Sequence, residues 1–346
     1  MRIALLTYST RPRGGVVHTF ALAEALVELG AEVTVWTLGR GELFRPVGVP
    51  VRVVEFPEIP GETVGARILR SIAALREAFT PDAYDVVHAQ DCISANAVDR
   101  CVRTIHHLDQ FTTPELAACH ERAIVRPYAH VCVSAAVAAE VRAGWGLAPV
   151  VIPNGVDAAR FAAATPAREH GEYLLSVGGI EPRKGSLDLL EAYALIRARI
   201  PQLRLVIAGG ETLFDYRDYR AAWETRAAAL NVTPEVLGPV PHDELPGLVA
   251  GAAAFAFPST KEGFGLAAME ALAAGVPVVV RDLPVLREVF GAAVGYGSDP
   301  SALAEALFQA IKEPDAARRG RGERLAAAHT WDAAARRHLE FYAALR

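Results

Sequence analysis

The chain has 346 residues, of which 52% are hydrophobic and 22% are charged, a composition that is ordinary for a globular enzyme. A chain of this length is expected to fold as two domains. The formal net charge of −5 argues against a general nucleic-acid-binding protein, so we expect no nucleic-acid partner.

The cysteines and the N-terminal residues bear on the cellular compartment. The four cysteines (Cys92, Cys101, Cys119 and Cys132) form no Cys-x2-Cys pair, so they suggest neither a zinc ribbon nor a disulfide framework. The first eight residues become polar too soon for a signal peptide, and no run of eighteen apolar residues occurs. We therefore expect a cytoplasmic protein.

The first 150 residues alternate short apolar runs with stretches of helical periodicity. Strands are predicted over 3–7 and 33–37, and a helix predicted over 16–29 follows Gly14 and Gly15. This succession of strand, glycine loop, helix and strand is typical of a doubly wound α/β sheet. The chain contains no G-x-G-x-x-G, which argues against a nicotinamide or flavin dinucleotide enzyme.

A predicted amphipathic helix over 64–79 has apolar residues on one side and Arg67, Arg70 and Arg76 on the other. Its polar side permits two interpretations, a solvated face or contact with a membrane surface. Further strands are predicted over 84–90, 102–109, 129–134 and 149–153, and a linker is expected over 155–170.

The same succession begins again after this linker. Strands predicted over 173–177 and 203–208 flank a helix predicted over 187–199, and a pair of glycines follows each strand. The repetition predicts two Rossmann-like, doubly wound domains that face each other across a cleft. We expect the first domain to cover 1–155 and the second 156–329.

The turn after the strand at 173–177 contains Glu181-Pro182-Arg183-Lys184-Gly185. Two adjacent cations on a glycine-containing loop suit a diphosphate, because Arg can hydrogen bond to two oxygens at once and Lys is a compact point charge.

The segment from 252 to 274 reads as a buried strand, a turn with Gly263 and Gly265, and a helix. Glycine lets the backbone approach a ligand closely, and the first N–H groups of a helix attract an anion such as a phosphate. Two carboxylates, Glu262 and Glu270, lie on either side of this turn. They would repel an anion unless they accept hydrogen bonds from neutral hydroxyls, in which sugars are rich. The alternative is that Glu262 complements the helix dipole and that Glu270 is solvated.

This E-x7-E pattern resembles glycosyltransferase family 4, the retaining sugar-nucleotide-dependent enzymes of the GT-B architecture. The resemblance implies that Glu270 holds the ribose hydroxyls and that Glu262 contacts the donor sugar. It also implies that the amides of Gly263, Phe264, Gly265 and Leu266 approach the sugar and the phosphates.

Other segments resemble the family with less specific patterns. Gly14 and Gly15 match a Gly-Gly that lies under the diphosphate and the acceptor, although a tight turn between strand and helix would also explain them. Val236-Leu237-Gly238-Pro239-Val240 matches an edge where Leu237 and backbone groups read the nucleobase. His106 matches a histidine that contacts the donor sugar, with His107 in place of the usual aspartate and Asp109 as an acidic substitute. Many relatives have Gly-Arg where this chain has Gly178-Gly179, so the missing arginine's role is transferred to Arg183, next to Lys184.

The resemblance implies a retaining glycosyltransferase of the hexosyltransferase type that moves a sugar from a nucleotide-diphosphate donor to an acceptor hydroxyl. In this architecture a closing helix, here about 330–346, returns to the first domain. The chain has no D-x-D, so we expect catalysis without a metal or other cofactor. The sequence leaves open the acceptor, the donor base, monomer or homodimer, and a peripheral location at the inner membrane face.

Two rival functions fit the same architecture. A sugar-nucleotide 2-epimerase would act on the donor without an acceptor, and a non-catalytic module would bind the nucleotide sugar without turnover. Both glutamates and the Arg-Lys pair argue against the module.

Overall fold

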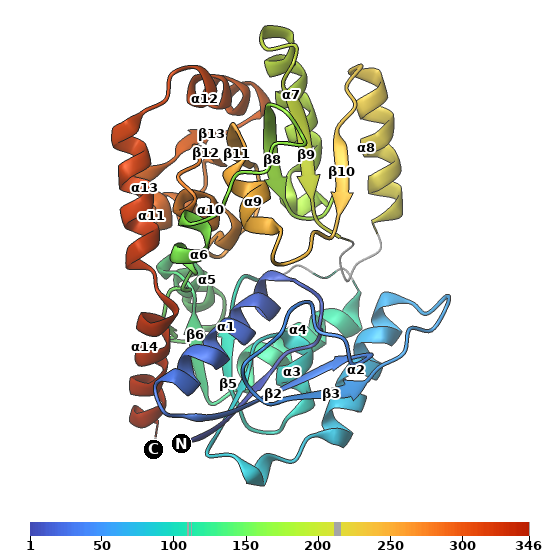
Figure 1. Cartoon of the computed structure of the whole chain (residues 1–346). Coiled ribbons are helices and arrows are strands. Elements are labelled where there is room, and N and C mark those ends of the chain that lie inside the picture. The colour runs from blue at the N-terminus through green and yellow to red at the C-terminus, as the bar shows by residue number, and fades with distance from the viewer. Residues whose placement is uncertain (109–110, 112, 211–215, 346) are drawn as a thin grey trace. The chain divides into compact units, whose positions relative to one another are not determined.

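The computed structural model describes residues 1–108, 111, 113–210 and 216–345. The chain divides into two compact units, each built around its own sheet (Figure 1). Unit 1 comprises Met1–Gly155 and Trp331–Arg346, and unit 2 comprises Val156–Thr330. Asp109, a candidate acidic residue, lies outside the described residues.

Unit 1 alternates strands and helices along most of its length. In chain order its elements are β1 (Arg2–Leu6), α1 (Gly14–Glu28), β2 (Glu32–Gly39), β3 (Val51–Glu55), α2 (Val64–Ala78), η1 (Pro81–Ala83), β4 (Val86–Ala89), α3 (Cys92–Ala97), β5 (Val102–Ile105), α4 (Pro114–Val125), β6 (Ala129–Cys132), α5 (Ala135–Trp145), β7 (Val150–Val151) and α14 (Trp331–Ala344).

Within the described residues, the sheet of unit 1 has the order β3-β2-β1-β4-β5-β6-β7, and every neighbouring pair is parallel. Strand β1 is an inner strand, third in this order, and its residues 3–6 are fully buried, as expected for a parallel strand covered by helices on both faces. Phe20 and Leu26 of α1 join Ile3 and Leu5 of β1 in one apolar core.

Helix α14 completes unit 1 although it lies far along the chain. It packs against α1, and the red α14 and the blue α1 lie side by side in Figure 1. Ala335 and Tyr342 of α14 belong to the same core as Ile3 and Leu5.

Unit 2 repeats the alternation with its own elements. These are α6 (Ala158–Ala162), β8 (Tyr173–Val177), η2 (Pro182–Lys184), α7 (Ser186–Arg199), β9 (Arg204–Ala208), α8 (Arg217–Ala229), β10 (Glu235–Gly238), α9 (Leu245–Ala250), β11 (Ala254–Phe257), α10 (Leu266–Ala273), β12 (Val278–Arg281), α11 (Pro284–Phe290), η3 (Gly291–Ala293), β13 (Gly295–Gly297), α12 (Pro300–Lys312) and α13 (Ala316–Ala328).

Its described strands form a parallel sheet with the order β10-β9-β8-β11-β12-β13. As in unit 1, the first strand of the unit is third in this order, and the fourth strand pairs with it on the side opposite the second. The strand order therefore reverses beside β8, and ligands of such sheets bind at the carboxyl ends of the strands at this reversal.

The structure corrects two details of the predicted elements. The expected linker over 155–170 contains helix α6, which Asp157 caps by accepting a hydrogen bond from the Arg160 amide at 3.2 Å. The strand predicted over 102–109 ends at Ile105, so His106 lies directly after β5. No helix in the described part of the chain is long and apolar enough to cross a membrane.

Candidate active site

The candidate site in unit 2 is formed by two loops at the reversal of strand order. Strands β8 and β11 are paired neighbours, so the loops that follow them, 178–185 and 258–265, leave the same edge of the sheet side by side. Arg183 and Lys184 lie in the first loop, and Glu262 and Gly265 lie in the second.

The second loop leads into helix α10 through Gly265. This glycine has a φ of +99°, and a Cβ at its position would lie 3.1 Å from the ring of Phe290, so only glycine suits both the conformation and the space. Its position as N-cap provides no side chain to accept hydrogen bonds from the first amides of α10. The sequence predicts an anion seat at these amides, where the positive end of the helix dipole also lies.

The two loops are held in direct contact by the backbone. The Thr260 amide donates to the Arg183 carbonyl oxygen at 2.8 Å. A Cβ at Gly185, whose φ is +63°, would lie 2.2 Å from the Pro258 carbonyl oxygen. Any larger residue at 185 would therefore separate the loops, which makes this glycine a structural requirement of the site.

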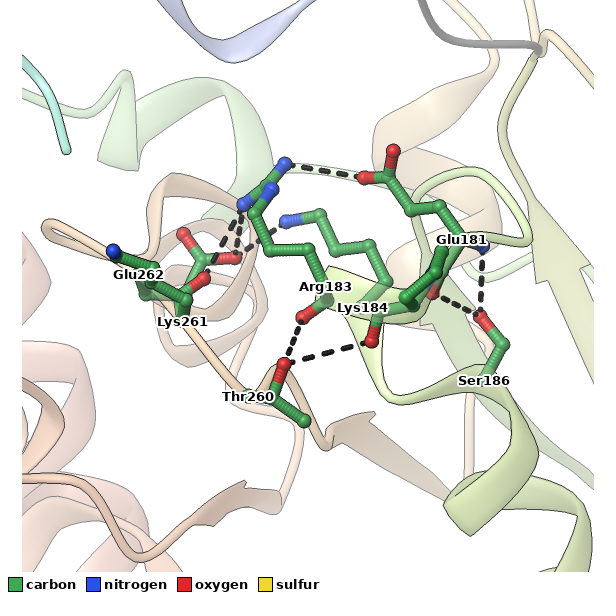
Figure 2. Close-up of polar contacts among 8 residues, drawn as sticks. Glu181, Arg183, Lys184, Ser186, Thr260, Lys261 and Glu262 are labelled. Atoms are coloured by element: carbon green, nitrogen blue, oxygen red, sulfur yellow. Dashed lines mark hydrogen bonds and ion pairs between the residues drawn. The ribbon is translucent and has the colours of Figure 1, made fainter. Parts of the chain in front are cut away.

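The contact brings together three of the predicted site residues. Lys184 Nζ lies 2.5 Å from Glu262 Oε1, and Arg183 Nη1 lies 3.2 Å from the same oxygen (Figure 2). The Lys184 side chain packs against Gly178, where an added Cβ would lie 3.4 Å from the Lys184 Cδ. The Lys184 ammonium also lies 5.1 Å from the centre of the Phe257 ring, a cation–π distance.

Glu181 is a member of this cluster that the sequence did not single out. Its Oε1 lies 3.1 Å from Arg183 Nη2, so the guanidinium lies between the carboxylates of Glu181 and Glu262 (Figure 2). Only 7% of the Glu181 side chain is exposed. Its place in the same Glu-Pro-Arg-Lys turn is the sequence feature that could have indicated that Glu181 belongs to the cluster.

Arg281, at the end of β12, holds the start of the second loop. This role was not predicted from the sequence. Arg281 is buried, and its Nε donates to the Pro258 carbonyl oxygen at 2.8 Å while Nη1 donates to that of Ser298 at 2.9 Å. It also pairs with Asp188 of α7. These contacts fix the start of the loop that carries Glu262.

Glu270 lies in α10. Burial raises the pKa of its carboxyl to about 7; nearby Arg160 acts in the opposite direction, and Asp157 raises the pKa further. The carboxyl of Glu270 therefore changes charge near neutral pH, unlike an ordinary solvated glutamate.

Three further donor-binding candidates are located in unit 2. Phe264 is 3% exposed, and its ring centre lies 5.7 Å from that of His329. Leu266 begins α10, and Leu237 lies on the edge strand β10, half-buried. Phe264 therefore supports the loop with its side chain, whereas the predicted ligand contact concerns its backbone amide.

The remaining candidates belong to unit 1. Gly14 begins α1, and a Cβ at Gly15 would lie 3.6 Å from Cδ2 of His106. The His106 ring is 4.8 Å from that of His18, which is 6.3 Å from that of His338 on α14. The start of α1 and the residue that follows β5 therefore lie next to each other.

His106, which is half-buried, is part of a cluster of four imidazoles with the fully buried His18, His88 and His338. Burial lowers the pKa of every member, and neighbouring histidines lower it further for His18, His88 and His106. His88 is hydrogen bonded on both sides, with Nδ1 2.6 Å from the Tyr342 hydroxyl and Nε2 2.7 Å from that of Thr104. The cluster is therefore neutral at physiological pH.

In the described residues, no group of three or more His, Cys, Asp or Glu side chains is arranged to hold a metal ion.

Comparison with known proteins decides the family. The model of "Glycosyl transferases group 1" matches residues 157–324, and that of "Glycosyltransferase Family 4" matches residues 12–160. The chain is 31% identical to D-inositol 3-phosphate glycosyltransferase of Salinispora tropica, over 99% of this chain and 85% of that protein. The chain belongs to glycosyltransferase family 4. The expected transferase of the hexosyltransferase class is thereby confirmed.

Other proteins similar to this glycosyltransferase include a mannosyltransferase and several proteins of known structure. Phosphatidyl-myo-inositol mannosyltransferase of Propionibacterium freudenreichii is 28% identical over 96% of this chain and 92% of that protein. Among solved structures, sucrose-phosphate synthase of Thermosynechococcus elongatus has a TM-score of 0.80 at 21% identity, covering 99% and 98% of the two chains. Anabaena HepE in complex with UDP and glucose has a TM-score of 0.76 at 19% identity, covering 99% of each. These structures confirm the predicted GT-B fold.

Proposed function

We propose that this glycosyltransferase transfers a sugar from a nucleotide-diphosphate donor to an acceptor hydroxyl, with retention of the anomeric configuration and without a metal. The observation that carries the proposal is the pair Arg183 and Lys184 beside the uncapped start of α10. Two cations and a set of backbone amides together provide a seat for a diphosphate. HepE, a structural neighbour, has been solved with UDP and glucose, which agrees with a nucleotide sugar as donor.

The same groups serve the departure of the diphosphate. Negative charge grows on the leaving group as the glycosidic bond breaks, and fixed positive charges nearby lower the energy of this transition state. Lys184 is already held in place by Gly178 and Phe257, so little reorganisation is needed. This role requires no metal bridge, and retention is consistent with a leaving phosphate that accepts the acceptor's proton.

The two glutamates bind neutral hydroxyls in this proposal. Glu262 contacts the donor sugar, and Glu270 accepts hydrogen bonds from the ribose. An ionised carboxylate is the stronger acceptor. Since the Glu270 pKa is about 7, ribose binding favours its ionised form, and donor affinity is expected to rise with pH through neutrality. In unit 1, His106 contacts the sugar as a neutral imidazole.

A thermal-shift screen over UDP-, GDP- and ADP-sugars tests donor binding, and mass spectrometry of products formed with cell-extract acceptors tests transfer. Donor consumption that needs an acceptor supports the transferase over the 2-epimerase, which would convert the donor alone. Turnover abolished by EDTA and restored by Mg²⁺ or Mn²⁺ would contradict the metal-independent mechanism.

The proposal includes a cytoplasmic location with peripheral contact at the inner membrane face. Between α2, α3 and α4 of unit 1 lies a cavity of about 330 Å³, lined by Leu69, Ile72, Ala73, Arg76, Asn96, Arg122 and Arg126. Leu69 is 48% exposed, and arginines beside apolar side chains suit an anionic membrane surface. Co-flotation with phosphatidylglycerol vesicles but not phosphatidylcholine vesicles is expected. Absence of binding to either would favour the solvated face.

A further inference from the structure

Arg183 has contacts that its place in the sequence does not explain. Nη2 meets Glu181 Oε1 at 3.1 Å, while Nη1 meets Glu262 Oε1 at 3.2 Å and the Lys261 carbonyl oxygen at 3.3 Å (Figure 2). The guanidinium is therefore fixed from both loops, and Glu181 provides the contact from its own loop.

Glu181 is itself held firmly. Its backbone amide donates to the Ser186 hydroxyl at 3.3 Å, and that hydroxyl lies 3.3 Å from the Glu181 carbonyl oxygen. With 7% of its side chain exposed, the carboxylate has little access to water, so its stability depends on a cation beside it. A buried carboxylate on a fixed backbone is a precise anchor for a flexible arginine.

We propose that Glu181 is a positioning residue that orients the Arg183 guanidinium toward the donor's diphosphate. Arg183 then acts in place of the arginine that many relatives carry where this chain has Gly179. The inference rests on the proposed function, because it takes Arg183 to be a diphosphate ligand.

Charge alone predicts the opposite effect, and this difference makes the inference testable. Glu181 and Glu262 offset the charges of Arg183 and Lys184. Removal of one carboxylate charge leaves the cluster more positive, so a purely electrostatic role would make Glu181→Gln bind a diphosphate more tightly. A positioning role makes the same variant bind it more weakly, because the neutral amide replaces a charge-assisted hydrogen bond and holds the guanidinium less firmly.

The experiment compares nucleoside diphosphates with monophosphates by titration calorimetry. UDP, GDP and ADP are titrated into the wild type to find the preferred base, and the matching monophosphate follows. Glu181→Gln, Glu181→Asp and Glu305→Gln are then measured in the same way. Glu305 is the matched control, because it forms an exposed pair with Arg199 on the same unit at 2.5 Å.

We expect Glu181→Gln to lose about tenfold in affinity for the diphosphate and less than twofold for the monophosphate. Glu181→Asp should recover part of the loss, and Glu305→Gln should match the wild type. Equal losses for both nucleotides would indicate a scaffold role and overturn the inference, as would unchanged or tighter diphosphate binding. If Glu181→Gln does not fold, Glu181→Asp alone must show the selective loss.

Failure of the proposed function gives a separate result. A wild type that binds none of the nucleotides would overturn the donor site and this inference with it. Wild-type diphosphate binding that is unchanged in Glu181→Gln would overturn the inference alone.

Discussion

Each unit contains a cluster of titratable side chains that are largely buried. The two clusters avoid the cost of burying charge in opposite ways, one by being neutral and the other by pairing opposite charges. In unit 1, the four histidines are neutral because burial lowers their pKa values. In unit 2, the charges of Arg183, Lys184, Glu181 and Glu262 are kept and paired. The paired cluster keeps the charges that a charged ligand requires, whereas the neutral cluster allows close packing of the four rings.

Removal of a charge from the paired cluster should have the largest effect. Lys184→Ala is expected to lower the turnover rate about 100- to 1000-fold, since positive charge is lost where the leaving group becomes negative. Donor consumption in the presence of acceptor measures the rate. Lys312→Ala, an exposed change at the end of α12, is the control and should match the wild type. Wild-type turnover in Lys184→Ala would remove this residue from the mechanism.

Glu270 of unit 2 differs from the paired cluster, because burial favours the neutral form of its carboxyl. Its folded-state pKa of about 7 lies above the ordinary 4.5, so ionisation destabilises the fold as pH rises from 4.5 to 7. Glu270→Gln should therefore add up to ~3 kcal/mol to the free energy of unfolding at pH 8 and little at pH 4. The same variant, like Glu270→Ala, should weaken nucleotide binding about tenfold. Urea unfolding measures the stability, and calorimetry measures the nucleotide affinity. Equal stabilisation at pH 8 and pH 4 would contradict the raised pKa of Glu270.

The neutral cluster predicts acid sensitivity in unit 1. Burial lowers the pKa of His338 from 6.5 to about 4, so the unfolded chain takes up a proton first as pH falls. The stability is present above pH 6.5 and is lost progressively between 6.5 and 4. His338 alone should cost ~2 kcal/mol between pH 7 and pH 5.

Urea unfolding of wild type and His338→Gln at pH 7 and pH 5 tests this value. The variant should show a smaller pH dependence, because it lacks the titrating ring. An identical pH dependence in both proteins would show that His338 does not contribute.

The smallest effect concerns the cysteines, all of which lie in unit 1 and are free thiols. Burial raises the pKa of Cys101 and of Cys132 to about 12, so both are uncharged like the histidines. Iodoacetamide at pH 8 should leave these two unmodified in the native protein and label them in urea. Half-buried Cys92 is the internal comparison. Rapid native labelling of Cys101 would mean that unit 1 opens readily.

The central strands could be predicted from the sequence because most of their residues are apolar. Strand β8 has the predicted bounds, Tyr173–Val177. The meeting of Arg183 with Glu262 could also be anticipated, since loops that follow neighbouring strands of one sheet share an edge.

Other features had no local signal. A single glutamate before Pro-Arg-Lys does not indicate whether its carboxylate is buried, so Glu181 was missed. The histidine cluster joins residues as distant as His18 and His338, and no short-range pattern connects them. Asp157 alone did not predict α6, because five residues are too few to show helical periodicity.

Helix α14 has a consequence for how the protein is made. The hydroxyl of Tyr342 is the hydrogen-bond partner of His88 Nδ1, 254 positions earlier. During synthesis the ribosome must translate the whole of unit 2 before this partner emerges. The nascent unit 1 therefore lacks the part of its apolar core that Ala335 and Tyr342 contribute, and it reaches its final stability only after unit 2 has been synthesised.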